Sequence, residues 1–229
     1  MPVPTRDLVI FDNDGVLIDS EKLAARSNAE LLTALGYPTT AQECERRFTG
    51  MSDKAMLAML RQEGYRLPDD FIEQMYATSE KAFETELEPV YGVRAVVEAL
   101  VRRSVSVAVA SNAPRFNVLK NLRTTGYEDL LPPEVCFSGL DVARPKPAPD
   151  LHQHILQHFH RQPDRAVVIE DSPTGAQGAC AAGVAFIGVL YAVAPYMKAQ
   201  RKEEFRALGA LAVLDTPEEL HETLSRTIS

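Results

Sequence analysis

The chain has 229 residues, of which 45% are apolar and 24% are charged, and its formal net charge is −8. These values are ordinary for a globular protein with a sizeable core, whereas a domain that binds nucleic acid electrostatically usually carries a basic surface. We therefore expect no nucleic-acid partner and, because no apolar stretch reaches membrane-spanning length, no membrane partner either.

The first apolar run, Leu8–Phe11, predicts a buried strand that ends in the polar sequence Asp12-Asn13-Asp14-Gly15. Between Asp19 and Glu88 the composition changes: valine is absent and good helix formers dominate. This change predicts an all-helical domain over residues 17–88, inserted directly after the first strand. Its helices are expected over residues 23–35, 41–48, 53–63 and 69–87.

From residue 89 onward, short apolar runs alternate with helical stretches. Continuous apolar strands indicate burial on both faces, as in a parallel sheet covered by helices. Residues 1–16 and 89–229 are therefore expected to form an α/β domain. Its predicted strands are Val105–Ala110, Ala166–Ile169 and Val184–Leu190, its helices lie near 93–103, 115–125, 149–160 and 173–182, and a helix, a strand and a helix close the chain after Ala192.

Polar residues follow three of the predicted strands: Asp12 and Asp14, then Ser111 and Asn112, then Glu170 and Asp171. Ligands bind beyond the carboxyl ends of strands in open parallel sheets. Residues two apart on a strand point the same way, so Asp12 and Asp14 can share a site while Asn13 points elsewhere. Crowded carboxylates repel one another, and Mg²⁺ prefers such sparse oxygen coordination. The pattern predicts a magnesium site at this edge.

Each of these features has an ordinary explanation when it is taken alone. A single Asp-x-Asp pair is a weak motif, and Lys146, between Pro145 and Pro147, would usually be a solvated loop residue. Only the joint arrangement points to chemistry. The four histidines of "LHQHILQHFH" fit an exposed polar helix face better than a metal site; they are His152, His154, His158 and His160.

Four segments in order resemble the motifs of the haloacid dehalogenase superfamily of phosphohydrolases, in the branch of β-phosphoglucomutase and small sugar-phosphate phosphatases. They are "FDNDGVLIDS", "VAVASNAP", "RPKPAPD" and "VVIEDSPTGAQGACAAG". The resemblance implies a Rossmann-like parallel-sheet core with the helical insert as a cap domain. Asn13 departs from the family pattern, which has an apolar residue or a cysteine there.

The resemblance also implies a role for each site residue. Asp12 would be the nucleophile and Asp14 the general acid and base, while Ser111 and Lys146 would hold the phosphoryl group. Asp171 would complete a Mg²⁺ site with Asp12 and the Asp14 carbonyl, and Glu170 would be an additional contact. Further substrate contacts are expected from Asn112 and, in the cap, from Gly50 and Ser52, in a loop that closes over the site.

The implied function is Mg²⁺-dependent hydrolysis of a small phosphate monoester, a sugar phosphate or related metabolite, through an aspartyl phosphate. A phosphomutase is the alternative, although Asp53 follows the cap loop where a second phosphate would favour a base; Lys54 or Arg47 could replace it. A non-catalytic phospho-acceptor or binding module is the alternative from another class, but it would be expected to have lost an acid or the lysine.

The three cysteines, Cys44, Cys136 and Cys180, lie far apart and match neither a disulfide framework nor a metal motif. The N-terminal sequence MPVPTRD lacks the basic and apolar segments of a signal peptide. Both observations favour a protein of the reducing cytoplasm. The oligomeric state stays open, and a monomer is compatible with the sequence.

Overall fold

The structure, a computed structural model, describes residues 6–49, 51 and 53–228. It divides into two compact units, which we call the core (residues 1–18 and 89–229) and the cap (residues 19–88). The division falls after Ile18 rather than after Val16, where the sequence placed it. The backbone N–H groups of Leu17 and Ile18 donate to the carbonyl of Asn13 at 2.9 and 3.1 Å, so both residues stay with the core.

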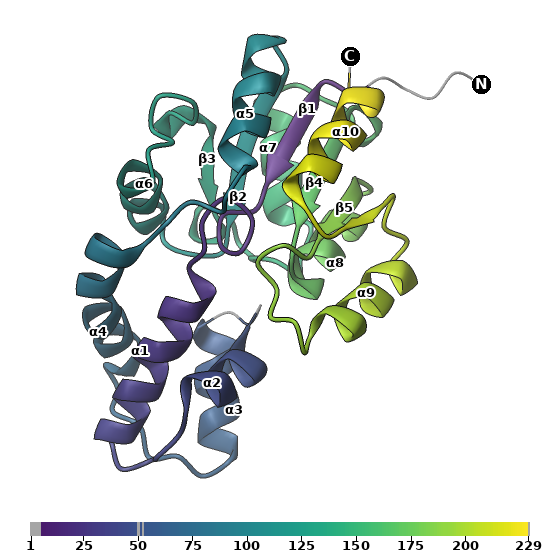
Figure 1. The fold of residues 1–229 in the computed structure, drawn as a ribbon. Helices are drawn as coiled ribbons and strands as arrows, with labels where there is room; N and C mark the ends of the chain where they lie inside the picture. The colour runs from purple at the N-terminus through teal and green to yellow at the C-terminus, as the bar shows by residue number, and fades with distance from the viewer. Residues whose placement is uncertain (1–5, 50, 52, 229) are drawn as a thin grey trace. The chain divides into compact units, whose positions relative to one another are not determined.

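A parallel sheet of six strands forms the centre of the core, in the order β3-β2-β1-β4-β5-β6 (Figure 1). The four side chains of β1 are fully buried, because this strand lies between β2 and β4 and both of its faces are covered. The sheet confirms the predicted α/β class. The strands are β1 Leu8–Phe11, β2 Ser106–Ser111, β3 Cys136–Ser138, β4 Ala166–Glu170, β5 Ala185–Val189 and β6 Val213–Leu214.

Helices cover both faces of this sheet. Helix α8 packs against α7 and α9, and these three helices contact strands β2 to β6, while α5 contacts β2 and α10 on the other side (Figure 1). The helices of the core are α5 Val93–Arg102, α6 Arg115–Thr124, α7 Asp150–His158, α8 Pro173–Ala181, α9 Lys198–Ala207 and α10 Pro217–Thr227, with single 3₁₀ turns at Pro133–Val135, Gly139–Asp141 and Pro163–Arg165. The closing helix, strand and helix are those that the sequence predicted.

The sequence did not predict strand β3. It has only three residues, Cys136–Ser138, and it follows Pro132 and Pro133, which read as a loop. A strand this short has no periodicity of its own. It is defined by its pairing with β2, where Ala110 lies opposite Phe137.

The described part of the cap contains four helices, α1 Glu21–Ala34, α2 Ala41–Phe48, α3 Asp53–Gln62 and α4 Phe71–Glu86. Gly36, with φ +89°, ends α1 in the left-handed conformation that glycine adopts most easily. Thr40 caps α2 by accepting from the N–H of Glu43 at 3.2 Å. The helices share an apolar centre of their own that includes Leu32, Cys44, Phe48, Leu60 and Phe71.

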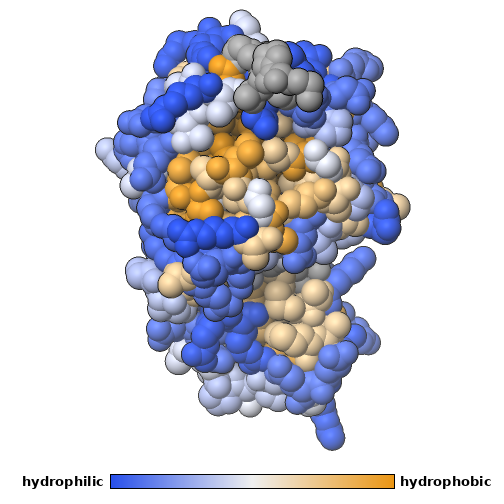
Figure 2. Space-filling view, turned by 90° about the vertical axis from the view of Figure 1, so that its right-hand side faces the viewer, coloured by the Kyte–Doolittle hydropathy of each residue, from blue (hydrophilic) through white to orange (hydrophobic). Residues whose placement is uncertain are grey.

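The surface mixes polar and apolar residues. Figure 2 shows one side of the molecule, on which apolar side chains gather in a patch with hydrophilic residues around it. Apolar atoms contribute much of the surface of any folded protein, so such a patch alone identifies no partner. Among the helices of the described residues, none is both long and apolar enough to cross a membrane.

Candidate active site

The register of the parallel strands aligns the ends of β1, β2 and β4. Phe11, the last residue of β1, lies opposite Val109 and Ile169. The N–H of Asp12 then donates to the carbonyl of Ile169 at 3.0 Å, which fixes the start of the loop after β1. The polar residues expected at this edge therefore meet there: Asp12, Asp14, Ser111, Glu170 and Asp171.

Lys146 joins this group from the turn that precedes α7. Its side chain is only 5% exposed, so the expectation for an ordinary loop lysine does not apply. The Nζ atom lies 2.7 Å from Asp12 Oδ1 and 2.7 Å from Glu170 Oε1, and it also donates to the carbonyl of Ala110 at 3.0 Å. These three acceptors match the three donors of an ammonium group.

Asn112 fixes the backbone on which Lys146 stands. Its side-chain oxygen accepts from the N–H of Lys146 at 3.0 Å, and its amide nitrogen donates to the Lys146 carbonyl at 2.9 Å. The carboxamide thus binds the backbone of one residue on both sides, so the geometry gives Asn112 a part in positioning the lysine. Its contact with substrate stays a prediction.

Negative charge exceeds positive charge in this buried cluster. Burial, together with the carboxylate of Glu170, raises the pKa of Asp12 well above its ordinary range. Burial alone would lower the pKa of Lys146, but Asp12 and Glu170 outweigh it and raise that pKa above the usual value of an amine. The lysine is therefore a cation at neutral pH, and a further cation would be stabilised beside the carboxylates.

Three buried carboxylates offer the oxygens for such a cation. One oxygen from each of Asp12, Glu170 and Asp171 lies within 4.8 Å of the others. These hard oxygen donors fit Mg²⁺, which binds few carboxylates and retains water. Both oxygens of Glu170 are also hydrogen-bonded, Oε1 to Lys146 and Oε2 to the N–H and Oγ of Ser172 at 3.1 and 3.0 Å. These hydrogen bonds agree with the role that the family resemblance implies for Glu170, an additional contact beside the proposed ligands Asp12 and Asp171.

Asp14 lies beside two side chains that donate to its carboxylate. Oδ2 accepts from Ser111 Oγ at 3.3 Å and from Asn13 Nδ2 at 3.2 Å. The expectation that Asn13 points elsewhere is therefore wrong for its amide nitrogen. The tight turn after Asn13 brings its fully buried side chain back toward Asp14, while its oxygen has no hydrogen-bond partner among the described residues.

Residues 9–189 match the family described as haloacid dehalogenase-like hydrolase. The chain belongs to this family. Its relatives include the phosphorylated carbohydrates phosphatase of Thermotoga maritima, 29% identical over 82% of this chain and 87% of the relative, and the 6-phosphogluconate phosphatase of Escherichia coli, 28% identical over 78% and 80%. A HAD family hydrolase from Deinococcus radiodurans, solved with bound phosphate and sodium, is 32% identical with a TM-score of 0.77, covering 97% of this chain and 96% of that one.

Two side chains beyond residue 189 reach the site of this haloacid dehalogenase-like hydrolase. The guanidinium of Arg201, on α9, donates to the carbonyl of Asp171. The hydroxyl of Tyr191 donates to the carbonyl of Val16 at 3.4 Å. The sequence alone predicts neither side chain at the site. Neither contact has a sequence pattern, because both depend on how the closing segment packs against the loops at the sheet edge.

Gly175 also has a closer relation to the site than its sequence pattern indicates. A Cβ atom on Gly175 would overlap the carboxylate of Glu170, whereas one on Gly178 would lie 3.3 Å from the Ala148 carbonyl and from the ring of His152. Gly175 therefore leaves space for a site residue, and Gly178 leaves space for a neighbouring helix.

The histidines of α7 do not share one exposed face. His154 and His158 are exposed and their rings contact Phe137, but His152 is fully buried, which corrects the expectation from spacing. It has room because Gly178 lacks a side chain. Both ring nitrogens of His152 lack hydrogen-bond partners among the described residues. Burial, and secondarily the charge of Lys146, lowers its pKa to about 3.

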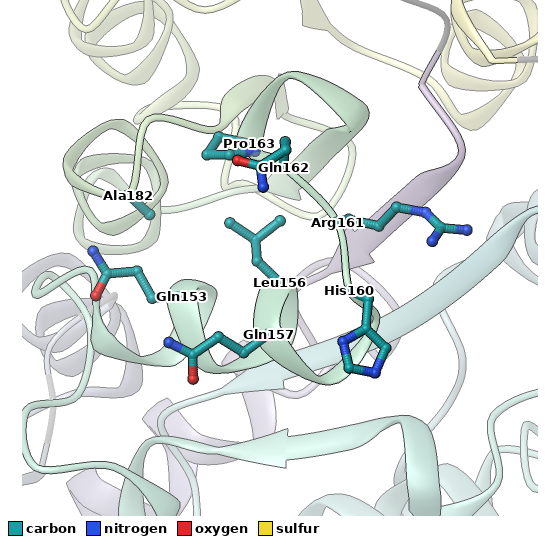
Figure 3. Close-up of a pocket in the computed structure, with 8 residues that line it drawn as sticks. All are labelled: Gln153, Leu156, Gln157, His160, Arg161, Gln162, Pro163 and Ala182. Atoms are coloured by element: carbon teal, nitrogen blue, oxygen red, sulfur yellow. The ribbon is translucent and has the colours of Figure 1, made fainter.

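A surface hollow of about 640 Å³ lies in the core near the end of α7 (Figure 3). It lies at the edge opposite to the acids, because Pro163 precedes β4 and Ala182 follows α8, which runs back from the site. Arg161 points away from the hollow, and its Nε donates to Asp7 at 3.0 Å. None of the lining residues is acidic; they are Gln153, Leu156, Gln157, His160, Arg161, Gln162, Pro163 and Ala182.

The two cap residues predicted to contact substrate, Gly50 and Ser52, lie outside the described residues. Their roles stay predictions from the sequence. Met51, between them, is 36% exposed.

Proposed function

We propose that this protein is a Mg²⁺-dependent phosphatase that hydrolyses a small phosphate monoester, a sugar phosphate or a related metabolite phosphate. The observation that carries the proposal is the buried Lys146 ammonium between Asp12 and Glu170, at the sheet edge where Asp14 also lies. The relatives named for phosphorylated carbohydrates and for 6-phosphogluconate support the substrate class.

Phosphoryl transfer to the protein is the first step of the proposed reaction. A carboxylate oxygen of Asp12 attacks the phosphorus, and the bond between phosphorus and the substrate's alcohol oxygen breaks. Asp14 gives its proton to that oxygen, so the leaving group departs as a neutral alcohol. Lys146 and Ser111 bind the phosphoryl oxygens, the lysine as a compact positive charge and the serine as a hydroxyl donor.

Hydrolysis of the phosphorylated Asp12 is the second step. Water attacks the phosphorus while Asp14 takes a proton from it, and the bond between phosphorus and the Asp12 oxygen breaks. Inorganic phosphate leaves, and the Asp12 carboxylate is restored. Mg²⁺ held by Asp12, Asp171 and the Asp14 carbonyl would supply the positive charge that allows an anionic nucleophile to approach an anionic phosphate.

The contacts of Arg47, one of the two cap bases named above, favour a hydrolase over a phosphomutase. A mutase needs a cationic group for the second phosphate of its substrate, and Arg47 was one candidate. Its guanidinium pairs with Glu63 and lies 3.5 Å from the hydroxyl of Tyr65, so another cap residue already uses its charge. A non-catalytic binding module has less support, because the core retains each acid and the lysine of the proposed mechanism.

A phosphate-release assay with a panel of phosphate monoesters tests the proposal. We expect hydrolysis of sugar phosphates in Mg²⁺, loss of activity in EDTA and recovery when Mg²⁺ is restored. Asp12→Asn should abolish turnover, whereas Asp164→Asn, an exposed substitution at the opposite edge, should leave it unchanged. Full activity in a chelated preparation, or an Asp12→Asn variant as active as the wild type, would exclude the mechanism. Faster isomerisation than hydrolysis of a sugar 1-phosphate would favour the mutase.

A further inference from the structure

Arg201 is a buried charged residue in a part of the chain that the family match does not reach. It lies on α9, it is 4% exposed, and the match ends at residue 189. Burying a guanidinium is costly unless its donors are used. Here Nη1 donates to the carbonyl of Asp171, and Nε lies 3.2 Å from a carboxylate oxygen of Glu204. The carbonyl is the contact that connects Arg201 to the candidate active site.

The carbonyl that Arg201 binds belongs to the peptide unit between Asp171 and Ser172. A peptide unit is rigid and planar, so its C=O and N–H groups cannot turn independently. The N–H of the same unit donates to Glu170 Oε2 at 3.1 Å. Arg201 therefore binds the C=O group of this rigid peptide unit, and the carboxylate of Glu170 binds its N–H group.

The Glu170 carboxylate passes this constraint to the reacting groups. Its second oxygen, Oε1, lies 2.7 Å from Lys146 Nζ, which lies 2.7 Å from Asp12 Oδ1. The connected series thus runs from α9 through one peptide plane, one carboxylate and one ammonium group to the proposed nucleophile. Every member of the series that carries a charge is buried, so water does not readily replace a lost contact.

We propose that Arg201 is a positioning residue for the active site: it fixes the 171–172 peptide and thereby the orientation of Glu170, Lys146 and Asp12. The inference rests on the proposed function for its effect on turnover, although its structural part does not. Anchoring of α9 does not require the arginine, because Phe205 on the same helix is fully buried and its ring lies 5.7 Å from that of Phe186. We therefore assign the buried guanidinium to fixing the 171–172 peptide through its hydrogen bond to the Asp171 carbonyl.

Arg201→Met tests the inference, because methionine retains an unbranched apolar side chain and removes every donor. Arg206→Met is the matched control on the same helix, since that side chain is 59% exposed and pairs with Glu203 at the surface. Three quantities are compared in the full chain: kcat/KM for p-nitrophenyl phosphate, the affinity for Mn²⁺ from electron paramagnetic resonance of the free ion, and the hydrogen-exchange rate of the Ser172 amide in metal-free protein.

We expect Arg201→Met to lower kcat/KM and Mn²⁺ affinity by about 10- to 100-fold, the usual effect of removing a group that orients metal-site residues. The Ser172 amide should exchange about tenfold faster or more, because its peptide can then turn away from Glu170. Amides in the middle of β5 should keep their rates, and Arg206→Met should match the wild type. Arg201→Lys, which retains one charged donor, should recover part of each loss.

An Arg201→Met protein that folds with unchanged Ser172 exchange and unchanged Mn²⁺ affinity would overturn the inference. If this variant does not fold, Arg201→Gln takes its place with the same expected direction and the same overturning result. The two proposals fail in distinguishable ways. A wild type without phosphatase activity, with accelerated Ser172 exchange in the variant, rejects the proposed function alone. An active wild type with an indifferent Arg201 variant rejects the positioning role alone.

Discussion

The ammonium nitrogen of Lys146 lies 2.7 Å from a carboxylate oxygen of Asp12. Both side chains are almost fully buried, and the same nitrogen lies 2.7 Å from Glu170. The lysine therefore reduces the repulsion between two buried acids. In the proposed mechanism the same ammonium group would bind a phosphoryl oxygen. We therefore expect Lys146 to contribute both to stability and to the proposed reaction.

Lys146→Met should reduce both the stability of the protein and its phosphatase activity. Removing one partner of a buried ion pair leaves uncompensated charge, which typically costs about 3–5 kcal/mol, so urea unfolding at pH 7 without metal should show a loss of that size. Phosphatase activity should fall to background. Lys202→Met is the control, because its ion pair with Asp215 at 3.3 Å is partly exposed and should contribute about 1 kcal/mol or less. Similar losses in the two variants would contradict this account of the Lys146 cluster.

Substitutions of Glu170 and of Asp171 should weaken Mg²⁺ binding to different extents. Both oxygens of Glu170 are hydrogen-bonded to Lys146 and Ser172, so Glu170→Gln should disturb the position of the lysine and weaken Mg²⁺ affinity by about tenfold. Asp171→Asn removes a proposed direct ligand and should weaken it by about 100-fold or more. Isothermal titration with Mg²⁺ measures both. The reverse order of effects would make Glu170 the direct ligand.

Gly175→Ala should lower phosphatase activity more than the addition of one methyl group usually does. The new methyl group would overlap the Glu170 carboxylate, so Glu170 must move and Lys146 loses an acceptor. We expect kcat/KM to fall by about 10- to 100-fold, as when a group that orients metal-site residues is disturbed. The protein should also lose roughly 1–3 kcal/mol of stability, as in other overpacked cores. Gly178→Ala, on the same helix, meets its neighbours at 3.3 Å and should retain most activity. Equal activities in the two variants would show that Glu170 has room to move.

The sequence predicts the parts of this protein that repeat a local pattern. Buried strands appear as apolar runs, and the acids after β1 and β4 lie at one edge because parallel strands align their carboxyl ends. The same reasoning missed β3, whose three residues become a strand only by pairing with β2. It also missed Arg201, since a contact from α9 to a carbonyl of another loop depends on packing that no periodicity records.

Two errors concern side chains whose neighbours differ from those that spacing assumes. The alternation of an ideal strand predicts that Asn13 points away from Asp14. The chain leaves the strand at Phe11 and turns, so the amide of Asn13 reaches Asp14. The spacing of the histidines of α7 predicts that His152 lies on an exposed face with the others. His152 is buried because Gly178, on the neighbouring helix α8, leaves room for its ring. Gly178 is 26 positions further along the chain, so the spacing within α7 does not indicate this contact.

The buried His152 should make the stability of the core depend on pH. Its pKa is lowered from 6.5 to about 3 by burial, so the folded protein holds the ring neutral while the unfolded chain takes up a proton below about pH 6.5. A lowered folded-state pKa means that the stability is fully present above the unfolded value of 6.5 and is lost as the pH falls toward 3. The loss should approach about 1.4 kcal/mol per pH unit in that window.

His152→Leu removes the titrating ring and its two unpaired nitrogens, so the variant should lose less stability than the wild type between pH 6.5 and the acid limit of folding. Urea unfolding at a series of pH values measures the difference in slope. His154→Leu, at an exposed position of the same helix, should retain the wild-type slope. If His152→Leu and wild type lose stability in parallel as the pH falls, the ring of His152 is protonated or hydrogen-bonded in the folded protein, and its burial does not control the acid sensitivity of the core.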